Sequence, residues 1–89
     1  MIARRAVLSG RVQGVGFRFF AERAAREAGV VGWVRNRPDG TVETLAQGDE
    51  ASVARYFEAL RAGPPGGRVT SLADEADEIG RYDSFEITG

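Results

Sequence analysis

Three structural signals follow one another in the segment Leu8-Ser9-Gly10-Arg11-Val12-Gln13-Gly14-Val15-Gly16-Phe17-Arg18. Up to Val12, apolar residues recur at every second position, which is typical of a strand. Two glycines, Gly14 and Gly16, then interrupt the alternation. After them the apolar residues recur at helical spacing and share one face, at Phe17, Phe20, Ala21, Ala24 and Ala28. The segment therefore predicts a strand, a glycine loop and a helix, each directly after the other.

A loop that leads into the start of a helix is suited to binding an anion. The first helical turn leaves backbone N–H groups without carbonyl partners, and the helix dipole adds partial positive charge there. The guanidinium of Arg18 could hold two phosphate oxygens beside such a nest of amides. The dinucleotide pattern G-x-G-x-x-G fails at Phe19, and no Lys-Ser/Thr pair follows as in a Walker A loop. A simpler interpretation stays open, in which Gly14 and Gly16 only let the strand turn into the helix.

Composition bounds the chemistry that the chain can perform. Its 89 residues predict one domain over residues 1–89, and 43% hydrophobic with 28% charged residues is typical of a globular protein. There is no Cys and no His, which excludes disulfides, thiol nucleophiles, imidazole bases and the usual zinc ligands. All 12 basic residues are Arg, so a Schiff-base lysine is excluded as well.

Charge and hydropathy indicate where the protein works. The formal net charge is −1, which argues against a protein whose main role is to bind nucleic acid. The N-terminus lacks the apolar run of a signal peptide, and no stretch of the sequence is apolar for the length of a membrane span. We therefore expect a cytoplasmic protein that binds neither nucleic acid nor membrane.

The rest of the chain predicts alternating short elements. Strands are expected at about residues 4–12, 30–37, 41–47, 68–73 and 84–88, and helices at about residues 17–28 and 50–62. Pro38-Asp39-Gly40 predicts a hairpin turn, and Asp49 is suited to cap the second helix. Residues 74–78 form an acidic patch that we interpret as solvated surface.

This order predicts an α+β fold. Strand, helix, strand, strand, helix, strand and a short fifth strand make the ferredoxin-like split βαβ sandwich, βαββαβ plus a short C-terminal strand. The expected sheet is antiparallel, with two helices on one face. On the second strand, Val34 and Trp33 point to opposite faces, and alternation alone leaves open which face the helices cover.

Two segments resemble the signatures of the acylphosphatase family. Leu8-x-Gly10-x-Val12-Gln13-Gly14-Val15-x-Phe17-Arg18 resembles the first signature, with every fixed position filled. Gly32-Trp33-Val34-Arg35-Asn36, followed by Gly40, Val42 and Gly48 at the same spacing, resembles the second. Later positions, Gly63-Pro64, Val69 and Phe85-x-Ile87, are similar to the family's sparser pattern. Two long motifs in the right order, in a chain of family length, identify the sequence as a member.

The resemblance implies an acylphosphatase, which hydrolyses the carboxyl–phosphate anhydride of acyl phosphates without metal, cofactor or phosphoenzyme. The catalytic residues would be Arg18, which binds phosphate, and Asn36, which orients water. The phosphate would also meet the backbone of Gln13, Gly14, Val15, Gly16, Phe17 and Arg18. The implied partners are a small acyl phosphate and inorganic phosphate, and the protein is expected to be a monomer.

The residues themselves suit this reaction, because phosphoryl transfer asks for positioned charge more than for a strong nucleophile. An asparagine is a very poor base, so we hypothesise that Asn36 holds the water by its amide and that the proton passes to the substrate phosphate. Taken alone, an Asn two residues before Pro38 is typical of a turn. The alternative function is a non-catalytic ferredoxin-like module that senses phosphate or binds a partner.

Overall fold

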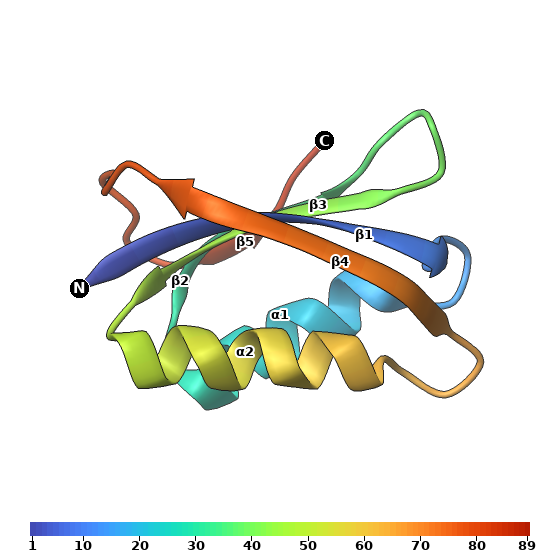
Figure 1. Cartoon of the computed structure of the whole chain (residues 1–89), viewed down its shortest axis with the longest axis horizontal. Coiled ribbons are helices and arrows are strands. Elements are labelled where there is room, and N and C mark those ends of the chain that lie inside the picture. The colour runs from blue at the N-terminus through green and yellow to red at the C-terminus, as the bar shows by residue number, and fades with distance from the viewer.

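The computed structural model describes residues 1–89 and consists of one sheet with both helices packed on one of its faces (Figure 1). The elements, in chain order, are β1 (Ile2–Arg11), α1 (Phe17–Ala28), β2 (Val31–Asn36), β3 (Val42–Gly48), α2 (Glu50–Ala62), β4 (Arg68–Asp77) and β5 (Phe85–Ile87). The predicted βαββαβ order with a short C-terminal strand is therefore confirmed. None of the helices combines the length and the apolar character needed to cross a lipid bilayer.

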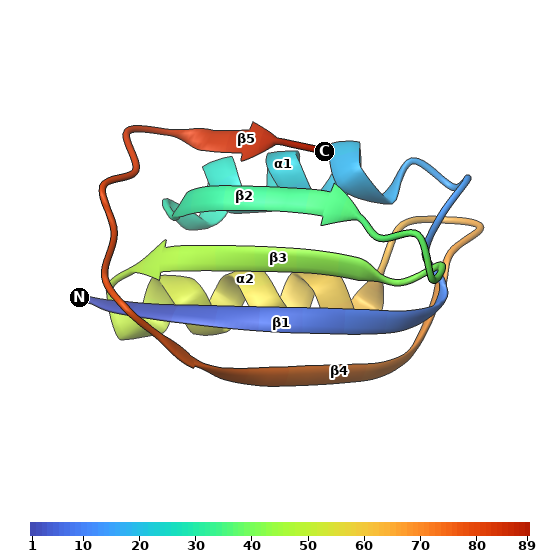
Figure 2. The ribbon, with the colours of Figure 1, turned by 90° about the horizontal axis from the view of Figure 1, so that it is seen from above.

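The sheet has the strand order β4-β1-β3-β2-β5, and its first four strands are antiparallel as expected (Figure 2). The fifth strand differs, because β5 pairs parallel to β2, through Gly32 with Phe85 and Val34 with Ile87. The chain leaves β4 at one edge of the sheet and returns along the opposite edge, so β5 runs opposite to β4 and in the direction of β2. The sheet is thus mixed rather than wholly antiparallel.

Capping residues lie at the end of α1 and at the start of α2, as predicted. Helix α1 runs from Phe17 to Ala28 and is followed by Gly29, whose left-handed backbone (φ 80°) lets its N–H bond the carbonyl of Ala25. The Asp49 side chain accepts a hydrogen bond of 2.8 Å from the N–H of Ser52 at the start of α2. The predicted stripe of α2 is buried, and it consists of Val53, Tyr56, Phe57 and Leu60.

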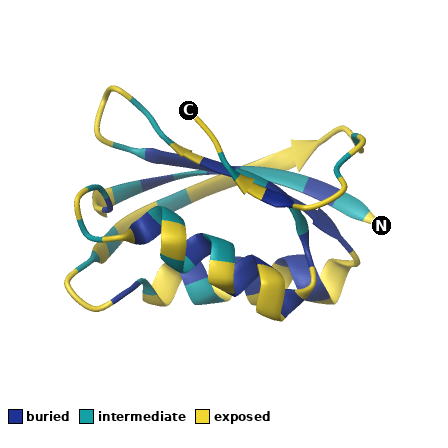
Figure 3. Cartoon of the chain, turned by 180° about the vertical axis from the view of Figure 1, so that it is seen from behind, coloured by how far each residue is buried: buried dark blue, intermediate teal, exposed yellow.

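The core lies between the helices and the sheet (Figure 3). At its centre the hydroxyl groups of Tyr56 and Thr44 lie 2.7 Å apart, and Thr44 also bonds the Trp33 carbonyl at 2.8 Å. Burial raises the pKa of Tyr56, so its hydroxyl stays protonated. Val34 is fully buried in this core, whereas Trp33 is only partly buried and lies on the opposite face. The packing thus decides which face of β2 the helices cover.

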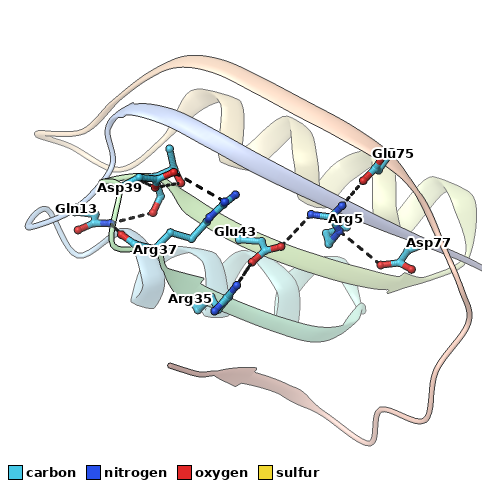
Figure 4. Close-up of polar contacts among 9 residues, drawn as sticks. Arg5, Gln13, Arg35, Arg37, Asp39, Glu43, Glu75 and Asp77 are labelled. Carbon is cyan, nitrogen blue, oxygen red and sulfur yellow. Dashed lines mark hydrogen bonds and ion pairs between the residues drawn. The ribbon is translucent and has the colours of Figure 1, made fainter.

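The face of the sheet away from the helices carries a chain of charges (Figure 4). The carboxylate of Glu43 on β3 accepts hydrogen bonds from Arg5 at 3.0 Å and from Arg35 at 2.8 Å. Burial alone raises the pKa of Glu43, but the hydrogen bonds from the two guanidinium groups lower it further than burial raises it. Both arginines are therefore already paired with the same buried carboxylate.

Strand β4 is longer than its sequence pattern predicts, because it continues through most of the acidic patch. Asp74 pairs with Arg4 at 2.7 Å, and Glu75 pairs with Arg5. The residues of this patch are exposed, as expected for solvated surface, and three of its carboxylates, Asp74, Glu75 and Asp77, also pair with arginines of the neighbouring β1.

Candidate active site

The glycine loop, residues 12–16, connects β1 to α1. Gly14 and Gly16 both have φ of 75°, and a Cβ at either position would meet nothing within 4 Å. The glycines are therefore required by the backbone conformation and not by lack of space. The first hydrogen bond of α1 runs from the Phe20 N–H to the Gly16 carbonyl at 3.0 Å, so the three N–H groups before it lie outside the helical ladder.

Nothing in the protein occupies these free N–H groups. Gly16 provides no side-chain cap, and the first turn of α1 contains no acidic residue. Most helices satisfy such groups with a Ser, Thr, Asp or Asn side chain, as Asp49 does for α2. The start of α1 thus keeps its donors and its partial positive charge for an anion from outside.

The guanidinium of Arg18 stands in the first turn of α1 beside these donors. The residue is partly buried, and its side chain takes part in none of the ion pairs or side-chain hydrogen bonds of the protein. Arg5 and Arg35 on the open face of the sheet share the Glu43 carboxylate, and Arg18 has no such partner. Its charge is therefore available to a ligand.

Asn36 is the last residue of β2, and its backbone is held opposite Val42 of β3. Its side-chain Oδ1 is the one buried side-chain polar atom of the chain without a hydrogen-bond partner. A buried acceptor left unpaired costs about 1–3 kcal/mol, so such an atom needs a donor from a water or a ligand. In the free protein this oxygen is enclosed by its surroundings, while Asn36 as a residue lines the cavity described next.

Arg18 and Asn36 line the same cavity, which has a volume of about 130 Å³. A water occupies about 30 Å³ in the liquid, so this space holds a group of a few heavy atoms. The lining residues are Val12, Gly14, Gly16, Phe17, Arg18, Phe19 and Asn36. The cavity has the composition of an oxyanion site, since glycines of the loop, Arg18 with its guanidinium and Asn36 with its carboxamide all line it.

Two of the predicted loop residues do not line this cavity. Val15 packs against the hydrophobic core, and the side chain of Gln13 bonds to the hairpin between β2 and β3. Conversely, sequence reasoning missed Val12 and Phe19 as lining residues. Phe19 is 66% exposed, and its signal was an aromatic residue off the apolar stripe of α1.

A larger groove of about 650 Å³ lies between α2 and the edge of the sheet, lined by residues that include Arg4, Phe57 and Asp74. Of its two arginines, Arg4 is already paired with Asp74, and Arg61 lies in the last turn of α2, whose start is capped by Asp49. The chain holds no group of three or more His, Cys, Asp or Glu side chains arranged for a metal ion. We therefore assign the candidate active site to the smaller cavity.

Comparison with known proteins gives one consistent result. The family model "Acylphosphatase" matches residues 4–87. The acylphosphatase of Archaeoglobus fulgidus is 45% identical over 87 residues, which cover 98% of each chain. That of Acaryochloris marina is 41% identical over 87 residues, covering 98% of this chain and 94% of the relative. The crystal structure of acylphosphatase from Bacillus subtilis superimposes with a TM-score of 0.97, at 38% identity and full coverage of both chains. By sequence and by structure, the chain belongs to the acylphosphatase family.

Proposed function

We propose that this chain hydrolyses acyl phosphates in the cavity between the glycine loop and Asn36. Arg18 and the free N–H groups of the loop bind the phosphoryl oxygens, and Asn36 orients the attacking water. Family membership supports the reaction itself, acyl phosphate phosphohydrolysis. The observation that carries the assignment of residues is the single cavity lined by both Arg18 and Asn36.

The reaction needs no protein nucleophile. The water oxygen forms a bond to phosphorus while the bond from phosphorus to the acyl oxygen breaks, and the electron pair of that bond leaves with the carboxylate. A carboxylate is a good leaving group, so positioning and charge stabilisation suffice. In this proposal Asn36, which lines the cavity, holds the water by its carboxamide. The proton of the water passes to a phosphoryl oxygen, since an amide cannot take it.

The arginine fork explains why a single cation is enough. A guanidinium presents two parallel N–H donors, which match two oxygens of one phosphoryl group. The third oxygen faces the N–H groups at the start of α1. Their partial positive charge stabilises the negative charge that develops on the phosphoryl oxygens in the transition state. Inorganic phosphate has the same oxygens, and we infer that it binds as a competitive product.

We also propose that the protein works as a monomeric single domain in the cytoplasm. The groups to which we assign binding and catalysis, which are Arg18, the amides of the glycine loop and Asn36, all belong to one chain. Elution at the mass of one chain in size-exclusion chromatography with light scattering is expected, across the concentrations used for the assay. A stable dimer would contradict the monomer.

The function is tested by phosphate release from benzoyl phosphate in the presence of EDTA. Turnover that EDTA leaves unchanged is the expected result. Saturable phosphate binding without any turnover would instead favour a phosphate-sensing module. Loss of turnover in EDTA, restored by a divalent cation, would contradict the metal-independent mechanism.

A further inference from the structure

One side chain joins the two halves of the proposed site. Gln13 of the glycine loop donates a hydrogen bond from Nε2 to the carbonyl of Arg37 at 2.8 Å and another to the carbonyl of Thr41 at 2.9 Å (Figure 4). The two N–H hydrogens of the amide are thus both used. Arg37 directly follows Asn36, and Thr41 directly precedes Val42, the residue paired with Asn36. The amide therefore holds the hairpin at the point where it presents Asn36.

The glycine loop has no other hydrogen bond to a distant part of the chain. Its remaining backbone bond is the one that the Gly16 carbonyl accepts from Phe20 within α1. No other side chain of residues 12–16 makes a hydrogen bond, and the further attachment of the loop is the packing of Val12 and Val15. The hydrogen bonding between the loop and the hairpin that carries Asn36 therefore depends on Gln13.

We propose that Gln13 is a positioning residue, whose amide sets the separation between the phosphate site and Asn36. This rests on the proposed function. Arg18 and the free N–H groups lie on the same side of the Gln13 contact, in the loop and α1, so they keep their mutual geometry when it is lost. Asn36 lies on the other side. Loss of the amide should therefore impair the orientation of water and spare the binding of phosphate.

The hairpin itself should survive removal of the Gln13 amide. The Thr41 carbonyl also accepts a hydrogen bond from the Arg37 N–H at 2.9 Å, and the Arg37 carbonyl accepts one from the Gly40 N–H at 3.1 Å. Both carbonyls thus keep a partner within the turn. A misplacement of about 1 Å can cost a factor of about 100 in rate, so kcat should fall by roughly tenfold to a hundredfold.

The test variant is Gln13→Met, which keeps the length of the side chain and removes its donors. The chain offers a matched control in Gln47, whose amide bonds the Gly80 carbonyl at 3.0 Å and the Gly80 N–H at 2.8 Å near the far end of β3. Both Gln13→Met and Gln47→Met should lower Tm. Only Gln13→Met should lower kcat for benzoyl phosphate, with the Ki for inorganic phosphate unchanged within about twofold.

A double-mutant cycle separates positioning from general damage. If Gln13 acts through Asn36, then Gln13→Met should lower kcat much less in an Asn36→Ala background than in the wild type. Equal losses in both backgrounds, an unchanged kcat in Gln13→Met, or a rise in Ki that matches the fall in kcat would each overturn the proposal.

A second variant keeps the positioning role testable if Gln13→Met does not fold. Gln13→Asn retains the amide donors on a shorter side chain, so the amide is withdrawn from the carbonyls of Arg37 and Thr41, and this variant then replaces Gln13→Met in the same cycle. An inactive wild type would overturn the proposed function, whereas an active wild type with an unaffected Gln13 variant would overturn the positioning role alone.

Discussion

Replacing Gly32 with alanine should destabilise the protein far more than its place in an ordinary strand suggests. Gly32 lies between β3 and β5 with φ of 139°, and a Cβ there would stand 2.0 Å from the Leu45 carbonyl oxygen and 2.9 Å from its carbon. These are backbone atoms of the central ladder, in which Gly32 pairs with Ala46, so no side chain can rotate aside. Overpacking typically costs about 1–3 kcal/mol, and a positive φ adds about 1–2 kcal/mol for a residue with a side chain.

The expected loss for Gly32→Ala is therefore about 2–5 kcal/mol of unfolding free energy, a large share of the total stability of a small domain. For a chain of this size, each kcal/mol lowers Tm by about 4–8 °C. Urea unfolding followed by far-UV circular dichroism measures the loss directly.

The matched control is Gly66→Ala. Gly66 also has a positive φ, of 85°, but a Cβ there would meet nothing within 4 Å. Gly66→Ala should therefore show only the backbone strain of about 1–2 kcal/mol. If the two variants differ by less than about 0.5 kcal/mol, well below an overpacking cost, the close approach of β3 is not what requires a glycine at position 32.

Three further results are expected. Arg18→Lys should raise the Ki for phosphate and lower kcat/KM on the order of a hundredfold, because a point charge cannot replace the planar fork, and wild-type hydrolysis of benzoyl phosphate by this variant would contradict the role of Arg18. Asn36→Ala should lower kcat by about a hundredfold with an unchanged phosphate Ki, and weakened phosphate binding with preserved turnover would refute the water-orienting role. The pKa of Glu43 in the folded protein is lower than its ordinary value of 4.5, so the ionised carboxylate stabilises the folded state when the pH is above 4.5. This stabilisation is lost as the pH falls from 4.5 through the pKa of the folded state. Glu43→Gln should therefore reduce stability at pH 7 and flatten its acid dependence, and an acid limb identical to the wild type would show that Glu43 does not contribute to it.

The helices were predictable because their signals are local. The apolar stripe of α1, its end at Gly29 and the Asp49 cap of α2 all lie within a few residues of the elements that they define. The direction of β5 and the extension of β4 were not, since each depends on pairing with a strand far away in the chain. The glycine at position 32 belongs to a recognised motif, but its physical reason, the carbonyl of Leu45, lies in another strand.

Some features of the candidate site could also be predicted from nearby residues, whereas others depend on distant parts of the chain. The free donors at the start of α1 follow from Gly14, Gly16 and the missing cap, all of which can be read locally. The roles of Arg18 and Asn36 came from the family resemblance and stay predictions, although the two residues line one cavity. The contact of Gln13 with the hairpin could not be foreseen, because its partners lie 24 and 28 residues further along the chain.

The position of β4 at the border of the sheet affects how one molecule meets another. Its ten residues leave a row of main-chain groups without a neighbouring strand, and such a row is a template for a strand from a second copy. Asp74, Glu75 and Asp77 lie along this row in ion pairs with Arg4 and Arg5, so a strand from a second copy would have to pack beside a series of charged groups. Salt screens interactions between exposed charges, and we therefore expect this edge to resist self-association least in concentrated salt.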